Sequence, residues 1–138
     1  MNTTEFRKLM QTIADGWNTK DAKNAADCFS DDAIYIEPPD KQFFRGKDQL
    51  YEYFGGEAGF DMKLAWHHLF FDEEKQHGAG EYTFEFNSKI HHGVAIVELE
   101  NGKIKLWREY DVPGNLSYEE FLETKGKQFK FTIKSLKK

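Results

Sequence analysis

The sequence predicts an α+β fold, with helices near the N-terminus packed on the concave face of a strongly curved antiparallel sheet. From residue 62 onwards, short apolar runs separated by turns are typical of strands. Asn101-Gly102 favours a tight primed turn between two of those strands. A curved sheet covered by helices on one face forms a cone with an open mouth, which favours a ligand pocket. The first helix is indicated by apolar residues at helical spacing, namely Phe6, Leu9, Met10, Ile13 and Trp17.

Capping residues and turn residues place the predicted elements in order. Asn2 or Thr3 can cap the first helix, and Asp21 can cap a short second helix. A strand at 33–37 ends before Pro38-Pro39. A third helix follows Gly46 and ends at Gly55-Gly56, and four strands follow it. The four strands are expected at residues 62–71, 78–86, 91–100 and 103–111.

Two features near the end of the predicted sheet concern its outer face and the last helix. Residues 94–99 are apolar on both faces, so both faces should be covered. Because the helices cover only one face, we expect a homodimer formed through the sheet. Ser117 with Glu120 predicts a capping box that opens a short helix. Residues 127–138 are expected to be a basic tail beyond a single domain at 1–126.

Composition and charge narrow the function classes. Net charge is -5, but residues 124–138 carry six Lys and no acid. The remaining body has 24 acids against 13 bases, a net charge of -11, which argues against nucleic-acid binding. We expect no membrane segment and no signal peptide. The single Cys28 excludes an internal disulfide and a Cys cluster for zinc, and a cytoplasmic location is expected.

The stretch after Asn101-Gly102 places an aromatic ring beside a carboxylate. Trp107, Glu109 and Asp111 alternate, so they share one face of the strand, opposite Ile104 and Leu106. A Trp wall next to a carboxylate suits a pocket. The alternative is a half-buried Trp beside an exposed Glu109 that forms an ion pair with Lys or Arg.

Four segments together resemble the nuclear-transport-factor-2-like superfamily with its cystatin-like cone, in particular the SnoaL-like branch that includes polyketide cyclases. The resemblance covers about residues 5–123 and implies a pocket in the cone, but the fold hosts enzymes, binders and transport factors. The segments that carry it are Trp17–Asp21, Phe29–Tyr35, Arg45–Asp48, and Glu100–Ile104 running into Trp107–Tyr110.

Two enzyme families on this fold imply roles for particular residues. The resemblance to limonene-epoxide hydrolase places its water-activating carboxylate at Glu109 and the water-holding positions at Tyr35 and Glu37. Its Arg-x-Asp has no counterpart at residues 78–86, so the proton-donating half is missing. The resemblance to ketosteroid isomerase places the base at Glu37. The oxyanion-hole positions of that isomerase fall near Ile13 and Ala95, which cannot donate.

These observations predict a protein with a ligand pocket. The first hypothesis is an enzyme of isomerase, cyclase or hydrolase type that performs acid/base chemistry on a small apolar molecule. The alternatives are a non-catalytic binder and a dimeric interaction module that uses the outer sheet face.

In each pair of adjacent histidines one ring should point into the cone, and we expect these to be His68 and His91. No cofactor is expected, and metal binding ranks below acid/base chemistry because no His-x-x-x-His spacing occurs. The candidate catalytic residues are Glu109, Glu37, Tyr35 and His68, and the candidate substrate-binding residues are Trp107, Trp66, Trp17, His91, Tyr82 and Phe84.

Overall fold

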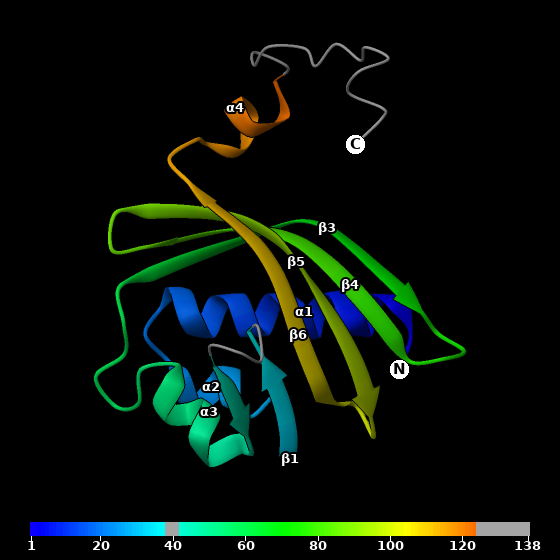
Figure 1. The fold of residues 1–138 in the computed structure, drawn as a ribbon. Coiled ribbons are helices and arrows are strands. Elements are labelled where there is room, and N and C mark those ends of the chain that lie inside the picture. The colour runs from blue at the N-terminus through cyan, green and yellow to red at the C-terminus, as the bar shows by residue number, and fades with distance from the viewer. Residues whose placement is uncertain (38–41, 124–138) are drawn as a thin grey trace, which may run out of the picture.

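A single curved sheet with three helices on its inner side and a fourth on its outer side makes up the fold (Figure 1). The computed structural model describes residues 1–37 and 42–123, so the predicted tail at 127–138 lies outside the described residues. The helices are α1 (Thr3–Asn18), α2 (Ala22–Ala26), α3 (Lys47–Tyr53) and α4 (Tyr118–Leu122). The strands are β1 (Phe29–Ile36), β2 (Phe43–Arg45), β3 (Met62–Asp72), β4 (His77–Phe86), β5 (Lys89–Glu100) and β6 (Lys103–Gly114).

The α+β class is confirmed, but the sheet is mixed rather than purely antiparallel. Its strand order is β2-β1-β6-β5-β4-β3, and β1 runs parallel to β6 while every other pair is antiparallel. Strands β3 to β6 are joined by short turns, which enforce alternating directions. Strand β1 reaches β6 only through the long connection that contains β2 and α3, so its direction is not set by a turn. The short strand β2 was not predicted.

The predicted helix and turn signals are confirmed. Asn2 accepts a hydrogen bond from the Glu5 backbone N–H at 2.8 Å and completes a capping box at the start of α1. Ser117 forms the predicted capping box with Glu120 at the start of α4. Asn101 (φ 52°) and Gly102 (φ 75°) both adopt the positive φ of a primed turn between β5 and β6. Within the described residues, no helix is long and apolar enough to cross a membrane.

The core fills the space between α1 and the inner face of the sheet. Large side chains from both layers are fully buried there, and each contributes roughly 2 kcal/mol through the apolar surface it removes from water. They include Phe6, Met10 and Ile13 from α1 with Val97 and Trp107 from the sheet. The inner face of the sheet therefore has its apolar side chains against α1.

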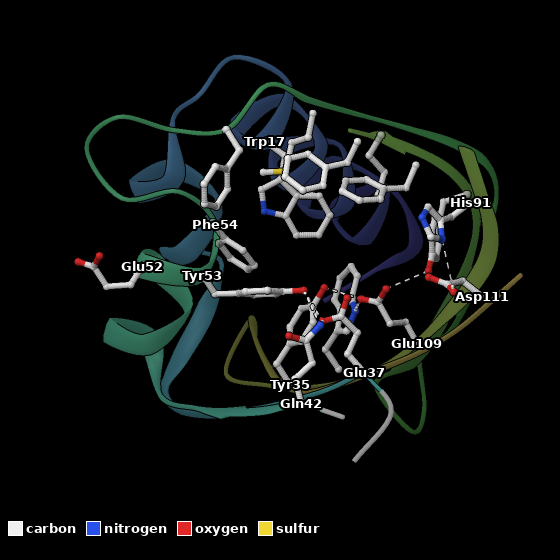
Figure 2. Close-up of a pocket in the computed structure, with 17 residues that line it drawn as sticks. Trp17, Tyr35, Glu37, Gln42, Glu52, Tyr53, Phe54, His91, Glu109 and Asp111 are labelled. Atoms are coloured by element: carbon white, nitrogen blue, oxygen red, sulfur yellow. Dashed lines mark hydrogen bonds and ion pairs between the residues drawn. The ribbon is translucent and has the colours of Figure 1, made fainter. Parts of the chain in front are cut away.

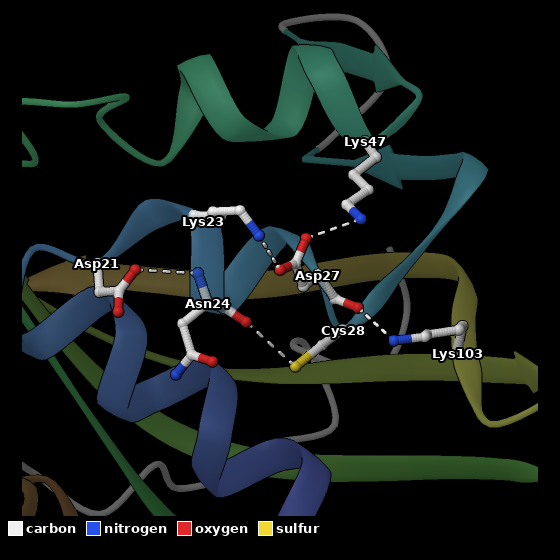
Figure 3. Close-up of polar contacts among 7 residues, drawn as sticks. All are labelled: Asp21, Lys23, Asn24, Asp27, Cys28, Lys47 and Lys103. Atoms are coloured by element: carbon white, nitrogen blue, oxygen red, sulfur yellow. Dashed lines mark hydrogen bonds and ion pairs between the residues drawn. The ribbon is translucent and has the colours of Figure 1, made fainter.

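Asp27, just after α2, connects three separate elements (Figure 3). Its two carboxylate oxygens each lie 2.7 Å from a lysine ammonium, one from Lys23 on α2 and one from Lys47 on α3. Its main-chain carbonyl accepts a 2.6 Å hydrogen bond from Lys103 at the start of β6. The hydrogen bonds from Lys23 and Lys47 lower the pKa of Asp27 to about 2. The contacts of Asp27 therefore link α2 to α3 and to the start of β6.

Two β-bulges change which face particular residues occupy. In β6, Ile104 pairs with Leu99 while Leu106 pairs with Glu98, so Lys105 is the extra residue. Ile104 is consequently buried on the same side as Trp107, whereas regular alternation predicted the opposite face. The bulge in β3 lies at His67, between Trp66 and His68, and it affects the candidate site.

Helix α4 lies on the outer face of the sheet, opposite α1 (Figure 1). The Tyr118 ring stacks on His67 with centroids 3.5 Å apart, and its hydroxyl donates to Glu81 at 2.8 Å. His92, only 6% exposed, contacts Phe121 and lies 2.8 Å from the Leu116 carbonyl through Nε2. The outer histidines therefore attach the last helix to the sheet.

Candidate functional site

A cavity of about 590 Å³ lies inside the cone between the helices and the inner face of the sheet (Figure 2). Aromatic rings form most of its wall, and a smaller group of polar side chains shares it. The aromatic lining residues are Trp17, Tyr35, Tyr53, Phe54, Phe60, Tyr82, Phe84, Phe86 and Trp107. The polar lining residues are Glu37, Gln42, Glu52, His91, Glu109 and Asp111.

Glu109, on the inner face of β6, is held by three uncharged donors. Tyr35 donates its hydroxyl to Oε1 at 2.5 Å, and the Trp107 indole N–H donates to the same oxygen at 3.0 Å. Tyr82 donates to Oε2 at 3.0 Å. Burial raises the pKa of Glu109, while the three hydrogen bonds act in the opposite direction. Both oxygens of the carboxylate are thus hydrogen-bonded, and no cation among the described residues forms an ion pair with it.

Glu37 lies directly after β1 and reaches the same part of the cavity. Its Oε2 accepts hydrogen bonds from the Tyr53 hydroxyl and, at 2.6 Å, from the Gln42 amide. Burial, with the nearby charge of Glu109, raises the pKa of Glu37 to about 7. Two coupled carboxylates titrate as a pair, so the charge of one makes ionisation of the other harder. This pair can hold one proton near neutral pH.

The three tyrosines around the carboxylates remain hydrogen-bond donors. Burial raises the pKa of Tyr35, Tyr53 and Tyr82 well above the usual range. The adjacent carboxylate adds to each shift, Glu109 for Tyr35 and Tyr82 and Glu37 for Tyr53. Protonated phenols next to carboxylates keep the acidic groups fixed in position.

His91 and Asp111 occupy another part of the lining (Figure 2). His91 Nδ1 lies 3.7 Å from Asp111 Oδ1, which is too long for a hydrogen bond, and Nδ1 has no hydrogen-bond partner among the described residues. A protonated imidazole would form an ion pair with Asp111 at this distance. His91 faces inward, as expected from strand alternation.

Eight of the predicted site residues line the cavity, and two do not. His68 was expected to point inward, and this orientation is wrong. The bulge at His67 places both His67 and His68 on the outer face, where the His68 side chain is 61% exposed and lies 3.7 Å from Glu81. The residues found in the lining are Glu109, Glu37, Tyr35, Trp107, Trp17, His91, Tyr82 and Phe84.

Trp66 belongs to the core beneath the cavity rather than to its lining. Its indole N–H donates to the Met10 carbonyl of α1 at 2.8 Å. Its ring lies over Gly80, where an added Cβ would come within 2.6 Å of the indole. The absence of a side chain at Gly80 makes room for Trp66 between the sheet and α1, so the ring packs there.

Sequence reasoning missed several polar lining residues. Asp111 could have been found, because it shares the alternating inner face with Trp107 and Glu109. Tyr53 is the last residue of α3 and has no motif of its own. Gln42 lies beyond the Pro38-Pro39 break, and no signal in the sequence links it to Glu37.

The described residues contain no group of three or more His, Cys, Asp or Glu side chains placed to hold a metal ion. Cys28 is buried, its thiol donates to the Asn24 carbonyl at 3.5 Å, and burial raises its pKa to about 11. The lining residues offer carboxylates, phenols, an amide, an imidazole and aromatic faces.

A protein-family model for the SnoaL-like domain matches residues 10–107, which is more than half of the chain. The chain belongs to the SnoaL-like family. The matched region spans α1 through Trp107 of β6 and so includes most of the cavity. No protein with curated annotation matches the chain significantly.

Solved structures with the same fold cover 80–96% of this SnoaL-like chain. A protein of unknown function with a cystatin-like fold from Methylobium petroleophilum PM1 is 20% identical, with 96% of this chain and 99% of that chain covered and a TM-score of 0.73. The epoxide hydrolase/cyclase-like enzyme SalBIII, described in pyran ring formation in polyether salinomycin, is 17% identical, with 80% and 93% covered and a TM-score of 0.71.

A putative ketosteroid isomerase from Kribbella flavida DSM 17836 is also similar to this SnoaL-like chain. It is 17% identical, with 91% of this chain and 93% of that chain covered and a TM-score of 0.68. At these identities the similarity establishes the fold, which agrees with the predicted cystatin-like, nuclear-transport-factor-2-like cone.

Proposed function

We propose that the protein is an enzyme that performs acid/base chemistry on a small, largely apolar molecule bound in the cone cavity. The observation that carries this proposal is the pair of carboxylates, Glu37 and Glu109, held by phenol donors at the wall of an aromatic cavity. Desolvated carboxylates in this setting can exchange protons near neutral pH.

The two carboxylates have different environments and therefore different roles. Both side-chain hydrogen bonds that Glu37 accepts from described residues go to Oε2, which leaves Oε1 for a substrate proton. With a pKa raised to about 7, Glu37 can accept a proton and return it. Glu109 is held on both oxygens, it accepts from Tyr35, and its charge adds to the effect of burial in raising the pKa of Glu37.

Trp17 supplies a donor for an oxygen atom of the substrate. It lines the cavity, it is 5% exposed, and its indole N–H has no hydrogen-bond partner among the described residues. A buried donor without a partner costs free energy, which a ligand oxygen would recover. A carbonyl compound whose α-proton moves through Glu37 fits this set of groups. The isomerase-like and cyclase-like neighbours are consistent with such chemistry on this fold.

Hydrogen-deuterium exchange of the substrate tests the proposal directly. Ketones that raise the melting temperature in a ligand screen are incubated with the protein in D₂O, and α-proton loss is followed by NMR. We expect enzyme-dependent exchange that Glu37→Gln abolishes while ligand binding is retained. Glu57→Gln, at an exposed position outside the cavity, is the matched control. Equal exchange by the wild type and Glu37→Gln would contradict the role of Glu37.

A non-catalytic binding protein is the second candidate, and the hydrogen bonding of Glu109 favours it. Every oxygen of that carboxylate accepts from a neutral donor, as in a purely structural buried acid. Under this alternative, ligands bind in the cavity and no bound ketone exchanges its α-protons. The same NMR experiment separates the two candidates.

We also propose that two copies associate through the outer sheet face, where α4 leaves apolar side chains uncovered. Val94 and Tyr110 are paired across β5 and β6 and are 38% and 63% exposed, and Val112 is 58% exposed. Sedimentation at tens of micromolar should show a dimer that Tyr110→Glu dissociates. A monomer would contradict the dimer without affecting the cavity proposal.

A further inference from the structure

The ionisable groups in the cavity lining are almost all acidic. Four carboxylates line it, and no Lys or Arg occurs among the lining residues in the described part of the chain. The single basic lining group is the imidazole of His91. Even with His91 protonated and one proton held by the Glu37–Glu109 pair, the lining keeps an excess of negative charge, contributed by that pair, by Asp111 and by the exposed Glu52.

The hydrogen bonds within the cavity do not remove this charge. Glu109 accepts from two phenols and an indole, and Glu37 accepts from a phenol and an amide. All five donors are neutral, so they orient the carboxylates without forming ion pairs. Charges away from bulk water interact over longer distances than charges in solution, so the cavity should attract cations and repel anions.

The aromatic walls favour the same kind of ligand. Ring faces carry partial negative charge and attract cations that lie over them. Tyr53 extends across the cavity so that its hydroxyl reaches Glu37, which places a ring face beside the carboxylates (Figure 2). Tyr35 and Trp107 stack on each other and donate to Glu109, so they hold this acid in place while the ring of Tyr53 provides the face next to it. Aromatic faces combined with unpaired carboxylates are the chemistry that recognises an organic ammonium group.

We propose that the cavity binds small molecules in which a protonated amine is carried on an apolar skeleton. The ammonium group lies near Glu37 and Glu109 against the ring of Tyr53, and the skeleton occupies the aromatic part of the cone. The inference rests on the proposed function, because it names the ligand class of the same cavity. Carboxylates and phosphate esters are excluded by charge.

Binding of a cation should release a proton from the cavity. The ammonium group stabilises the ionised form of Glu37, whose pKa in the free protein is raised to about 7. Near pH 7 a protonated amine therefore displaces part of a proton, and a neutral ligand of the same shape does not. Calorimetry in two buffers that differ in ionisation enthalpy measures this release on the wild-type protein.

Three probes with one skeleton test the proposal: 1-adamantylamine, 1-adamantanol and 1-adamantanecarboxylate. Their dissociation constants are measured at pH 7 by the quenching of tryptophan fluorescence, since Trp17 and Trp107 line the cavity. We expect the amine to bind about tenfold more tightly than the alcohol, and the carboxylate to bind most weakly. We also expect proton release with the amine only.

Two variants test whether the acids of the cavity cause the preference for the amine over the alcohol. Glu37→Gln should reduce the preference for the amine over the alcohol several-fold while the alcohol binds as before, and Glu57→Gln should leave both unchanged. Equal binding of amine and alcohol, or tighter binding of the carboxylate, overturns the ligand class and leaves the proposed function standing. If none of the three probes binds to the folded wild type, the ligand class is overturned, and the ketone-exchange experiment separately decides the proposed function.

Discussion

Tyr35 and Trp107 lie opposite each other on the parallel strands β1 and β6, and both donate to the same oxygen of Glu109. Their rings stack with centroids 5.4 Å apart and planes within 8°. The residues are far apart in the chain, so only the β1–β6 pairing brings their donors together. The acidic centre of the cavity is therefore built on the one parallel ladder of the described sheet.

Tyr35→Phe should destabilise the protein and raise the pKa of Glu109. The substitution keeps the stacked ring and removes one hydrogen bond to a partly buried carboxylate, which costs about 2 kcal/mol. Urea unfolding at pH 7 measures the loss. Tyr110→Phe, on the exposed outer face, is the matched control and should change stability by less than about 0.5 kcal/mol. Equal losses in the two variants would show that the Glu109 contact carries no special stability.

Stability should fall as the pH rises from about 5 to about 8. The folded-state pKa of Glu37 is raised to about 7, so in this window the folded chain binds more protons than the unfolded chain. Allowing for partial exposure of Glu37, we expect a loss of about 2 kcal/mol across the window. Glu37→Gln should flatten this dependence in urea titrations at four pH values. An unchanged slope would mean that Glu37 is not the titrating group.

Asp27→Asn should weaken the attachment of α2 to α3. The pKa of Asp27 is lowered to about 2, so its stabilisation is present above the unfolded value near 4 and is lost as the pH falls through about 2. Because the two lysine pairs are solvent-exposed, the loss at pH 7 should be about 1 kcal/mol and should shrink in 1 M salt. Asp61→Asn, at an exposed position before β3, is the control, and a salt-independent loss would argue against the ion pairs.

Thr83→Val should loosen α4 without disturbing the cavity. The Leu116 carbonyl can only accept, so His92 Nε2 carries the proton and Nδ1 accepts from the Thr83 hydroxyl at 2.9 Å. The Thr83 oxygen in turn accepts from His67 Nε2 at 2.6 Å. Valine matches the shape of threonine but breaks both links, which costs about 2 kcal/mol.

The measurement for this variant is amide hydrogen exchange. We expect faster exchange in residues 115–122 with the inner strands unchanged, whereas Thr12→Val on α1 should leave the exchange of α4 as in the wild type. Unchanged protection of α4 in Thr83→Val would show that the histidine relay does not hold the helix.

Much of the fold follows from local signals in the sequence. The cap at Asn2, the capping box at Ser117 and the Asn101-Gly102 turn depend only on neighbouring residues, and each was found as predicted, with Asn2 forming a capping box as well. The alternation that places Glu109 beside Trp107 is also local. The orientation of His68 could not be predicted correctly, because the bulge at His67 interrupts the alternation of the strand and no residue type in the sequence marks its position.

The sequence by itself determined the order of the elements apart from β2, the helix ends, and a strand that carries an aromatic ring beside a carboxylate. Tertiary structure decided which distant groups meet that carboxylate: Tyr35 and Tyr82 at Glu109, with Tyr53 and Gln42 at Glu37. The physical reason is the distance along the chain between the residues that interact. Caps, turns and alternation arise from contacts between neighbours in the chain, whereas the charge, burial and hydrogen bonding of the cavity arise where β1, α3, β4 and β6 converge.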